Sequence, residues 1–176
     1  IISFNSGKAK LTGRTNTTVV VCTITTAFAN TDAKTDWKLG AFSDTTGHPS
    51  CVSFFEQRLA FAGTTAEPQT LYFSKSGDYE NMTAGTNADD AMIYTIASNQ
   101  VNRIRYLKAQ RTLIVGTTGG EFTVSADGTD AAITPSNIVI KKQSSYGTAN
   151  VDAIPAGNAV LFLQKAKRKI RELTYN

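Results

Sequence analysis

The chain has 176 residues, of which 41% are hydrophobic and 18% are charged, and its formal net charge is +4. These values are typical of a globular protein of about one domain, or one domain plus part of another. No apolar run approaches the ~18 residues that a membrane span needs, so no membrane anchor is predicted. The mild positive charge permits an anionic partner without requiring one.

Frequent threonine and 13 glycines favour β-structure, because β-branched side chains suit the pleat and glycine suits tight corners. The two cysteines, Cys22 and Cys51, have no C-x-x-C spacing and no neighbouring histidine, which argues against a zinc site. Both lie in apolar, strand-like runs, so we expect buried free thiols and no disulfide. The chain opens without methionine in a strand-like pattern, and we expect it to be an internal piece of a longer protein.

Residues 1–45 are predicted to be the end of a small β-domain. Short strands are expected over residues 1–4, 8–11 and 18–28, followed by a polar loop over 29–36. The β-branched run 19–25 predicts a central strand of this unit. Trp37, the single tryptophan, is expected to be a core anchor, because an indole buries much apolar area.

Residues 46–176 are predicted to form repeated antiparallel β-hairpins. The apolar runs 52–55 and 59–62 flank a charged corner at 56–58, and weaker copies of this pattern occur over 101–117 and 159–175. The corner arginines Arg58, Arg111 and Arg168 are spaced by 53 and 57 residues. This period predicts about two to three β-propeller-like blades, fewer than the 4–8 that close a propeller, with a β-sandwich as the alternative.

Further strands are expected at 71–74, 92–97, 121–125 and 138–140. In the second hairpin, alternation places Ile104 and Tyr106 on one face and Arg103 and Arg105 on the other. Residues 164–173 contain no glycine or proline and would also suit a helix, but the repeat favours a hairpin.

No catalytic, cofactor or metal site is predicted, and we do not expect an enzyme. The single histidine, His48, precedes a proline in a turn, where it is expected to be exposed. The stretch 116–120 lacks the Lys-Ser/Thr of a phosphate-binding loop and is expected to be a turn. The acidic pairs Asp78 with Glu80 and Asp89 with Asp90 match no calcium-loop pattern and are expected to face solvent.

Basic side chains gather in the second and third hairpins, and two interpretations stay open. They form either a contact face for phosphates or a protection of strand edges against aggregation. No aromatic residues alternate with them, as they would in a platform for single-stranded nucleic acid. The candidate contact face consists of Arg103, Arg105, Lys108, Arg111, Lys167, Arg168 and Lys169.

Several motifs in a fixed order carry a resemblance over about residues 37–176. The blocks include Phe54-Phe55-Glu56-Gln57-Arg58-Leu59, Ser74-Lys75-Ser76-Gly77-Asp78-Tyr79-Glu80-Asn81, Gly116-Thr117-x-Gly119-Gly120-Glu121-Phe122 and Ser144-Ser145-Tyr146-Gly147. In this order they resemble the tail nozzle (tail tubular B) family of short-tailed bacteriophages and their prophages. The third corner departs from the family's Asn-Gly-like turn and reads Lys165-Ala166-Lys167. The motif residues are Trp37, Gly40, Pro49, Phe55, Gln57, Arg58, Leu59, Gly63, Gly77, Asp78, Tyr79, Glu80, Gly116, Gly120, Tyr146, Arg171 and Glu172.

The resemblance implies a structural protein of the virion, made in the host cytoplasm, in which the motif residues build hairpin corners and blade contacts. Six copies would form a ring next to the tail adaptor protein, and viral DNA would pass through its lumen without sequence recognition. A carbohydrate-binding β-domain of the tail is the alternative, but it needs exposed aromatics, and Phe54, Phe61, Phe73, Phe122 and Phe162 all lie within predicted strands. A polysaccharide-cleaving enzyme would depend on Asp78 and Glu80.

Overall fold

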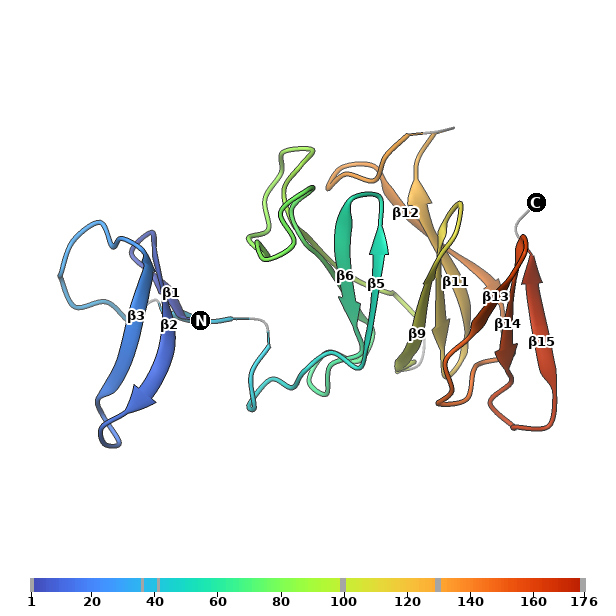
Figure 1. Cartoon of the computed structure of the whole chain (residues 1–176), viewed down its shortest axis with the longest axis horizontal. Helices are drawn as coiled ribbons and strands as arrows, with labels where there is room; N and C mark the ends of the chain where they lie inside the picture. Colours follow the sequence, from blue (N-terminus) through green and yellow to red (C-terminus); the bar gives the residue numbers. More distant parts are fainter. Residues whose placement is uncertain (1, 36, 41, 99–100, 129–130, 175–176) are drawn as a thin grey trace. The chain divides into compact units, whose positions relative to one another are not determined.

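The computed structural model describes residues 2–35, 37–40, 42–98, 101–128 and 131–174, and these ranges contain strands but no helix. Their strands form four antiparallel sheets (Figure 1), which confirms the all-β prediction. The chain divides into two compact units, unit 1 (Ile1–Gly47) and unit 2 (His48–Asn176). The division falls two residues after the boundary predicted at residue 45.

Unit 1 is a single sheet in the order β3-β2-β1-β4. Its strands are β1 (Ile2–Phe4), β2 (Gly7–Arg14), β3 (Val20–Thr26) and β4 (Lys38–Leu39). The prediction of a central strand was wrong, because β3 is an edge strand whose residues are all exposed. Cys22 is exposed with it, and Trp37 is 56% exposed, so neither is the buried residue that the sequence predicted. A β-branched run favours a strand but does not distinguish an edge from a centre.

The described residues of unit 2 form three sheets, in each of which every strand pairs with the next along the chain. The first sheet holds β5 (Cys51–Phe55), β6 (Arg58–Ala62), β7 (Thr70–Phe73) and β8 (Met92–Thr95). The second holds β9 (Ile104–Ala109), β10 (Leu113–Thr117), β11 (Gly120–Ala126) and β12 (Ile138–Ser144). The third holds β13 (Ile154–Ala156), β14 (Ala159–Leu163) and β15 (Ile170–Thr174). The predicted repeated hairpins are therefore present, and their arrangement in a propeller stays a prediction.

The second sheet lies between the other two, and both of its faces are buried (Figure 1). On β10, Leu113 and Val115 pack against the first sheet, whereas Ile114 packs against the third. Each face therefore borders its own hydrophobic cluster. This explains why β10 reads as a continuous apolar run and does not alternate with polar residues.

A β-bulge in β9 overturns the predicted alternation of the second hairpin. Gly116 pairs with Tyr106, but the next residue of β10, Thr117, pairs with Ile104, so Arg105 is the extra residue. Ile104 consequently packs towards the first sheet and Tyr106 towards the third, whereas the sequence placed them on one face. The bulge turns the tyrosine ring towards a buried carboxyl group described below.

The three corners are not equivalent, contrary to the repeat that the arginine spacing suggested. The first is a two-residue turn at Glu56 and Gln57, with φ of 46° and 59°, the twist of a type I′ turn. Arg58 follows it as the first residue of β6 and is 2% exposed. Arg111 and Arg168, by contrast, are exposed. The third corner turns through Lys167 at a φ of 57°, and residues 164–173 form a hairpin, as the repeat predicted.

Candidate functional site

The buried guanidinium of Arg58 binds backbone carbonyl groups of the loop that follows β7. Its Nη1 donates to the carbonyl oxygens of Ser74 at 2.8 Å, Asp90 at 2.7 Å and Asp89 at 3.3 Å, and Nη2 donates to that of Ala88 at 2.6 Å. Burial lowers the pKa of Arg58. The nearby carboxylates of Asp89, Glu56 and Asp90 oppose this shift, because they favour the charged guanidinium. Because a guanidinium stays protonated in proteins, this is a buried cation that fastens a loop.

Ion pairs on the surface of the same loop add to this attachment. Lys75 Nζ lies 2.8 Å from Asp89 Oδ2 and 3.9 Å from Asp90 Oδ1. The hydrogen bond between Lys75 and Asp89 lowers the pKa of Asp89 and raises the pKa of Lys75. The Gly77 amide donates to the carbonyl of Gln57 at 2.9 Å, which ties the loop to the first corner. Asp89 and Asp90 were predicted only to face solvent, but both lie within ion-pair distance of Lys75. Asp78, beside Gly77, is exposed, as predicted.

A second buried polar group, Glu121, faces the third sheet. One row of paired residues crosses all four strands of the second sheet: Tyr106, Gly116, Glu121 and Ser144. The Ser144 hydroxyl donates a hydrogen bond to Glu121 Oε2. The backbone amides of Tyr146 and Gly147 also donate to the Glu121 carboxyl group. Glu121 is fully buried, and burial raises its pKa against these hydrogen bonds. Burial likewise raises the pKa of Tyr106, and the nearby Glu121 adds to that shift.

Two atoms of this row, Glu121 Oε1 and the Tyr106 hydroxyl, are buried without a hydrogen-bond partner among the described residues. The Tyr106 ring lies over Gly116, where an added Cβ would be 2.0 Å from Tyr106 Cε1. Glycine at this motif position is therefore required by the close approach of an aromatic ring. A Cβ added at Gly147, which has a φ of 67°, would lie 2.4 Å from the Thr118 carbonyl oxygen.

The structure brings two predicted motif residues together between the second and third sheets. The Arg171 guanidinium lies over the Tyr146 ring, 4.0 Å from its centroid, and Arg171 Nε donates to Gln164 Oε1 at 3.2 Å. This cation–π contact joins β15 to the loop after β12. Glu172 is exposed and accepts a hydrogen bond from Thr174 Oγ1 at 3.2 Å.

The other motif residues divide between the interior and the surface. Phe55, Gly63 and Gly120 are buried, and Gly40, Pro49 and Leu59 are half-buried. The exposed ones are Trp37, Gln57, Gly77, Asp78, Tyr79 and Glu80. Sequence reasoning did not select Glu121, Tyr106 or Ser74 as site residues. The signal for Glu121 was the apolar run of β10, which implies that both faces of this sheet are buried.

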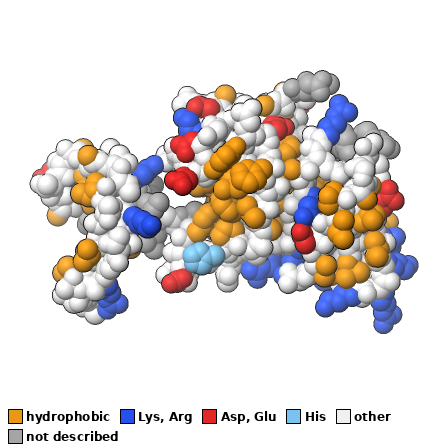
Figure 2. Space-filling view, in the orientation of Figure 1, with side chains coloured by type: hydrophobic (Ala, Val, Ile, Leu, Met, Phe, Trp, Pro, Cys, Tyr) orange, Lys and Arg blue, Asp and Glu red, His pale blue; other side chains and the backbone are white. Residues whose placement is uncertain are grey.

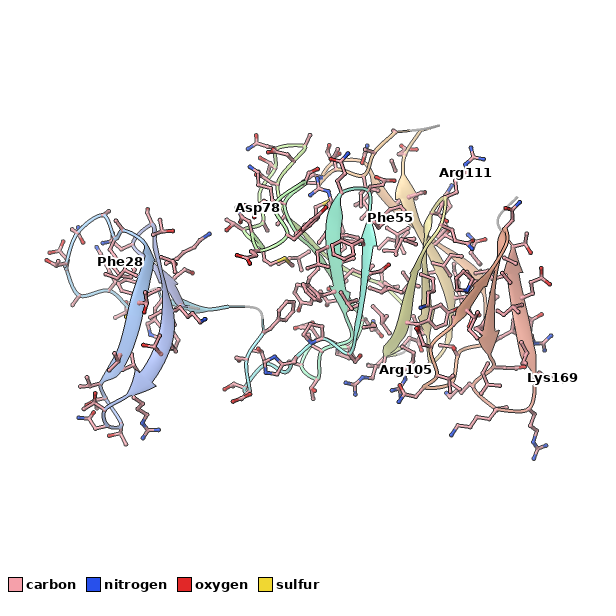
Figure 3. The ribbon with its side chains drawn as sticks, viewed as in Figure 1. Phe28, Phe55, Asp78, Arg105, Arg111 and Lys169 are labelled. Carbon is pink, nitrogen blue, oxygen red and sulfur yellow. The ribbon has the colours of Figure 1, made fainter. Side chains whose placement is uncertain are left out.

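The predicted basic contact face is not continuous. Arg105 and Lys169 lie towards one end of the strands, and Arg111 lies towards the other (Figure 3). Arg105 Nη1 donates to Asn150 Oδ1 at 3.1 Å, and Lys108 Nζ lies 2.6 Å from Asp152 Oδ2. Arg103 Nη2 makes a long contact of 3.4 Å with the carbonyl of Gly63. The exposed members of the set are Arg111 at the second corner and Lys167, Arg168 and Lys169 at the third corner.

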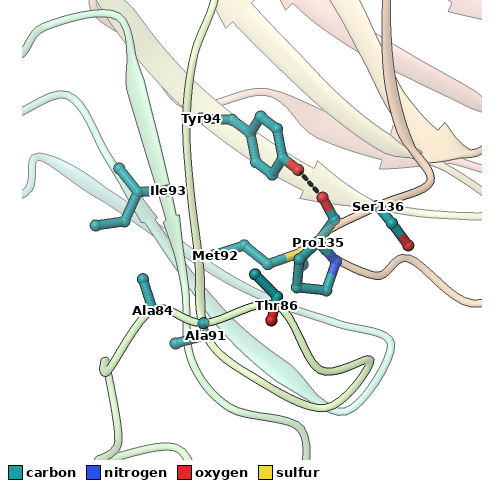
Figure 4. Close-up of a pocket in the computed structure, with 9 residues that line it drawn as sticks. Ala84, Thr86, Ala91, Met92, Ile93, Tyr94, Pro135 and Ser136 are labelled. Atoms are coloured by element: carbon teal, nitrogen blue, oxygen red, sulfur yellow. Dashed lines mark hydrogen bonds between the residues drawn. The ribbon is translucent and has the colours of Figure 1, made fainter.

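A shallow, mainly apolar hollow of about 320 Å³ lies beside β8 (Figure 4). The Tyr94 hydroxyl on its wall donates to the carbonyl of Pro135 at 2.5 Å. The remaining lining residues are Ala84, Gly85, Thr86, Ala91, Met92, Ile93 and Ser136. This lining contains no acid, histidine or lysine that would serve as a general base.

The described ranges contain no group of three or more His, Cys, Asp or Glu side chains placed to hold a metal ion. They also contain no helix that could cross a membrane. Both cysteines are free, and burial raises the pKa of the half-buried Cys51 thiol to about 11, which disfavours the reactive thiolate. His48 is exposed, as predicted. No protein-family model and no curated protein matches this chain.

Proposed function

We propose that this chain is a structural part of a bacteriophage tail, in the wall of a tube through which DNA is ejected into the host. The ordered motifs over residues 37–176 support this assignment. The observation that carries it is what several motif residues do: they fasten loops and sheets to one another. Arg58 binds carbonyl groups of a loop, and Arg171 of β15 packs on Tyr146 of the loop after β12.

A tube wall must keep its shape while a highly charged polymer passes. Stacked antiparallel sheets suit this task, because their backbone groups are paired within each sheet and their faces bury one another. In this proposal, copies of the chain form a ring that adjoins an adaptor protein. Passing DNA meets only sequence-independent phosphate contacts, for which the exposed cations of the third corner are suited.

The location in the virion is tested on purified phage particles from the source of this sequence. Gold-labelled antibodies raised against the 176-residue chain are expected to decorate the tail, and mass spectrometry is expected to find the chain in several copies per particle. Particles that infect normally and contain no trace of the chain would contradict the proposal.

One observation favours a second function, binding of a surface carbohydrate. Phe54 lies within β5, as predicted, but its side chain is 62% exposed. It meets Tyr79, 44% exposed, edge to face at a ring separation of 5.1 Å. Exposed aromatic rings of this kind are a feature of sugar-binding sites. A glycan array separates the two functions: binding that is lost in Tyr79→Ala would favour carbohydrate recognition, and an array without hits would remove it.

A further inference from the structure

The strands of unit 2 are connected alternately at two ends, because each sheet is an antiparallel meander (Figure 1). We name these ends the lower end and the upper end, after their places in Figure 1. The described connections of the lower end are residues 63–69, 96–98, 101–103, 118–119, 145–153 and 164–169. Those of the upper end are residues 56–57, 74–91, 110–112, 127–128, 131–137 and 157–158.

The two ends carry opposite charges. The lower connections have five bases and two acids, a net charge of +3: Arg103, Lys165, Lys167, Arg168 and Lys169 against Glu67 and Asp152. The upper connections have two bases and six acids, a net charge of −4: Lys75 and Arg111 against Glu56, Asp78, Glu80, Asp89, Asp90 and Asp127. Lys and Arg side chains gather along the lower edge of unit 2 (Figure 2).

The lower connections form one continuous surface across the three sheets. Four backbone hydrogen bonds of 2.8–3.0 Å join them in order, from amide to carbonyl: Ile104 to Pro68, Thr118 to Arg103, Thr148 to Thr117 and Lys165 to Gly147. Two basic side chains within strands add to this surface. Arg105 lies at the same end (Figure 3), and Lys142 Cε lies 2.9 Å from the place that a Cβ on Gly120 would take.

The two acids of the lower end compensate little of this positive charge. Asp152 Oδ2 lies 2.6 Å from Lys108 Nζ, so a cation outside the connections already balances Asp152. Glu67 lies in the first sheet's connection, and its carboxylate accepts a hydrogen bond from the Thr70 hydroxyl at 3.3 Å. Four exposed cations remain that form no ion pair within the part of the chain that the structure describes: Lys165, Lys167, Arg168 and Lys169.

The positions of these four cations decide between the two interpretations that the sequence left open. Basic residues that protect a sheet from aggregation lie on its edge strands. The four cations lie instead in a connection, beyond the ends of β14 and β15. Protection of a strand edge therefore does not explain them, whereas a contact with phosphates does.

We infer that the lower end of unit 2 binds the phosphate backbone of double-stranded DNA without reading its sequence. A duplex presents one negative charge per ~1.7 Å of its axis, which suits a surface of closely spaced cations. Single strands are held largely by stacking of their bases on aromatic rings. The one aromatic residue of the lower connections, Tyr146, already has the Arg171 guanidinium over its ring at 4.0 Å. The choice of DNA as the polyanion rests on the proposed function, which the inference deepens by naming the surface that meets the DNA.

Fluorescence anisotropy of a short labelled duplex, titrated with the purified 176-residue chain, tests the inference. We expect a dissociation constant on the order of 10⁻⁴ to 10⁻⁶ M, equal for unrelated sequences. About five phosphate contacts give a slope of about −4.5 for the logarithm of the association constant against the logarithm of the salt concentration. A single strand of the same length is expected to bind more weakly. No binding at low salt, or tighter binding of the single strand, would overturn the inference.

Two corner arginines provide a matched pair of variants. Arg168 lies in the lower end and Arg111 in the upper end, and both are exposed. Arg168→Gln is expected to weaken binding severalfold and to reduce the salt slope by about 0.9, the value of one phosphate contact. Arg111→Gln is expected to leave the affinity and the slope unchanged. Equal effects of the two substitutions would overturn the inference, provided that thermal unfolding shows both variants to be folded.

The extent of the surface is tested on the second sheet. Lys142 is exposed and lies beside the Gly120 turn, so Lys142→Gln is expected to weaken DNA binding severalfold. Lys141→Gln is the control, because Lys141 is also exposed but points to the other face of β12, one residue further from the lower end. Its effect should be clearly smaller. Unchanged binding by Lys142→Gln would overturn a surface that spans the sheets.

Association between copies of the chain is the competing outcome, because the upper end is acidic. Sedimentation velocity without DNA measures it. A chain that self-associates at low salt, loses this association with Arg168→Gln and does not bind the duplex would overturn the inference in favour of contact between unlike ends.

The inference and the proposed function fail separately. The DNA titration uses the purified chain, whereas the tail location is tested on phage particles. A chain that is found in tails but does not bind the duplex would overturn the inference alone. A chain that binds the duplex but is absent from tails would overturn the function alone.

Discussion

At the scale of single residues, Arg58 shows how a buried cation can stabilise a loop that contains only turns and isolated β-bridges. Its guanidinium donates to four carbonyl oxygens, and it lies at the start of β6, where the chain leaves a two-residue turn. An arginine fork suits this task because it presents several donors in one plane. The loop of residues 75–90 is therefore held mainly through its backbone.

Replacing Arg58 with methionine keeps much of the side-chain volume and removes all of these donors. We expect a loss of about 2–4 kcal/mol in the free energy of unfolding, because buried carbonyl groups lose their partners. Urea denaturation measures this loss, and faster proteolysis within residues 75–90 should accompany it. Arg111→Met, at the exposed second corner, should change stability by no more than about 0.5 kcal/mol. Equal effects of the two substitutions would contradict this role of Arg58.

Glu121 predicts a pH dependence with a definite sign. Its pKa in the folded chain is raised by burial above the ordinary value of 4.5, so the folded state holds the proton more tightly than the unfolded state. The stability that Glu121 contributes is complete below that ordinary value and is lost as the pH rises through the folded pKa. Glu121→Gln keeps the neutral shape and should remove this decline.

The measurement is the free energy of unfolding from pH 4 to pH 8 for the original chain, for Glu121→Gln and for the exposed control Glu80→Gln. We expect the difference between the original chain and Glu121→Gln to change steadily across this range in favour of the variant. A constant difference would show that Glu121 titrates alike in both states.

Some of these residues could be predicted from the sequence and others could not. Arg58 and Gly116 belong to motifs whose order is visible in the chain, and a corner role for Arg58 follows from its place after a turn. The closeness of Tyr106 to Glu121 could not be predicted, because it depends on a bulge at Arg105 that has no local sequence signal. The exposure of Trp37 shows that a large apolar side chain alone does not locate a core.

At the scale of elements, the first hairpin carries local strain that tertiary contacts offset. Glu56 and Gln57 both adopt the left-handed conformation, which costs about 1 kcal/mol for each residue other than glycine. Glu56 Oε2 accepts a hydrogen bond from the Ile133 amide at 2.6 Å, so its side chain fastens the corner to a distant loop. No comparable side-chain bond is described for Gln57.

This difference predicts that two glycine substitutions in the same turn have different effects on the free energy of unfolding. Gln57→Gly should stabilise the chain by about 0.5–1 kcal/mol, because it relieves the strain at φ 59°. Glu56→Gly should be neutral or destabilising, because it also removes the bond to Ile133. Thermal unfolding of both variants checks the order, and a more stable Glu56→Gly would contradict it.

The packing of Tyr106 over Gly116 predicts strong coupling between β9 and β10. Gly116→Ala should cost about 1–3 kcal/mol, because its Cβ would overlap the ring at 2.0 Å. In a Tyr106→Val background the same substitution should cost much less. A double-mutant cycle by urea denaturation measures the coupling, and additive effects would show that the ring moves aside without cost.

The elements themselves were largely predictable, and their environments were not. Alternation and turn residues located the hairpins of unit 2, including the one over residues 159–175, where propensity alone also allowed a helix. Whether a strand lies at an edge or in a centre depends on pairing with distant residues. For this reason β3 was misplaced, and the three corners turned out to be unlike.

At the scale of the whole molecule, unit 2 is a succession of β-meanders whose inner faces are buried and whose two outermost sheets carry exposed hydrophobic side chains, among them Val52, Ile154 and Ile170. Its acids and bases are segregated towards opposite ends of this succession. Exposed hydrophobic side chains that gather on a sheet are a feature of surfaces that other protein segments cover. This organisation supports the proposal of an architectural role.

The most direct test of that role is a nonsense mutation within the coding sequence of the phage, compared with the same phage grown in a suppressor host. The account predicts filled heads that lack a functional tail tube and cannot deliver DNA, with infectivity restored by suppression. Infectious particles with normal tails in the absence of the chain would contradict it.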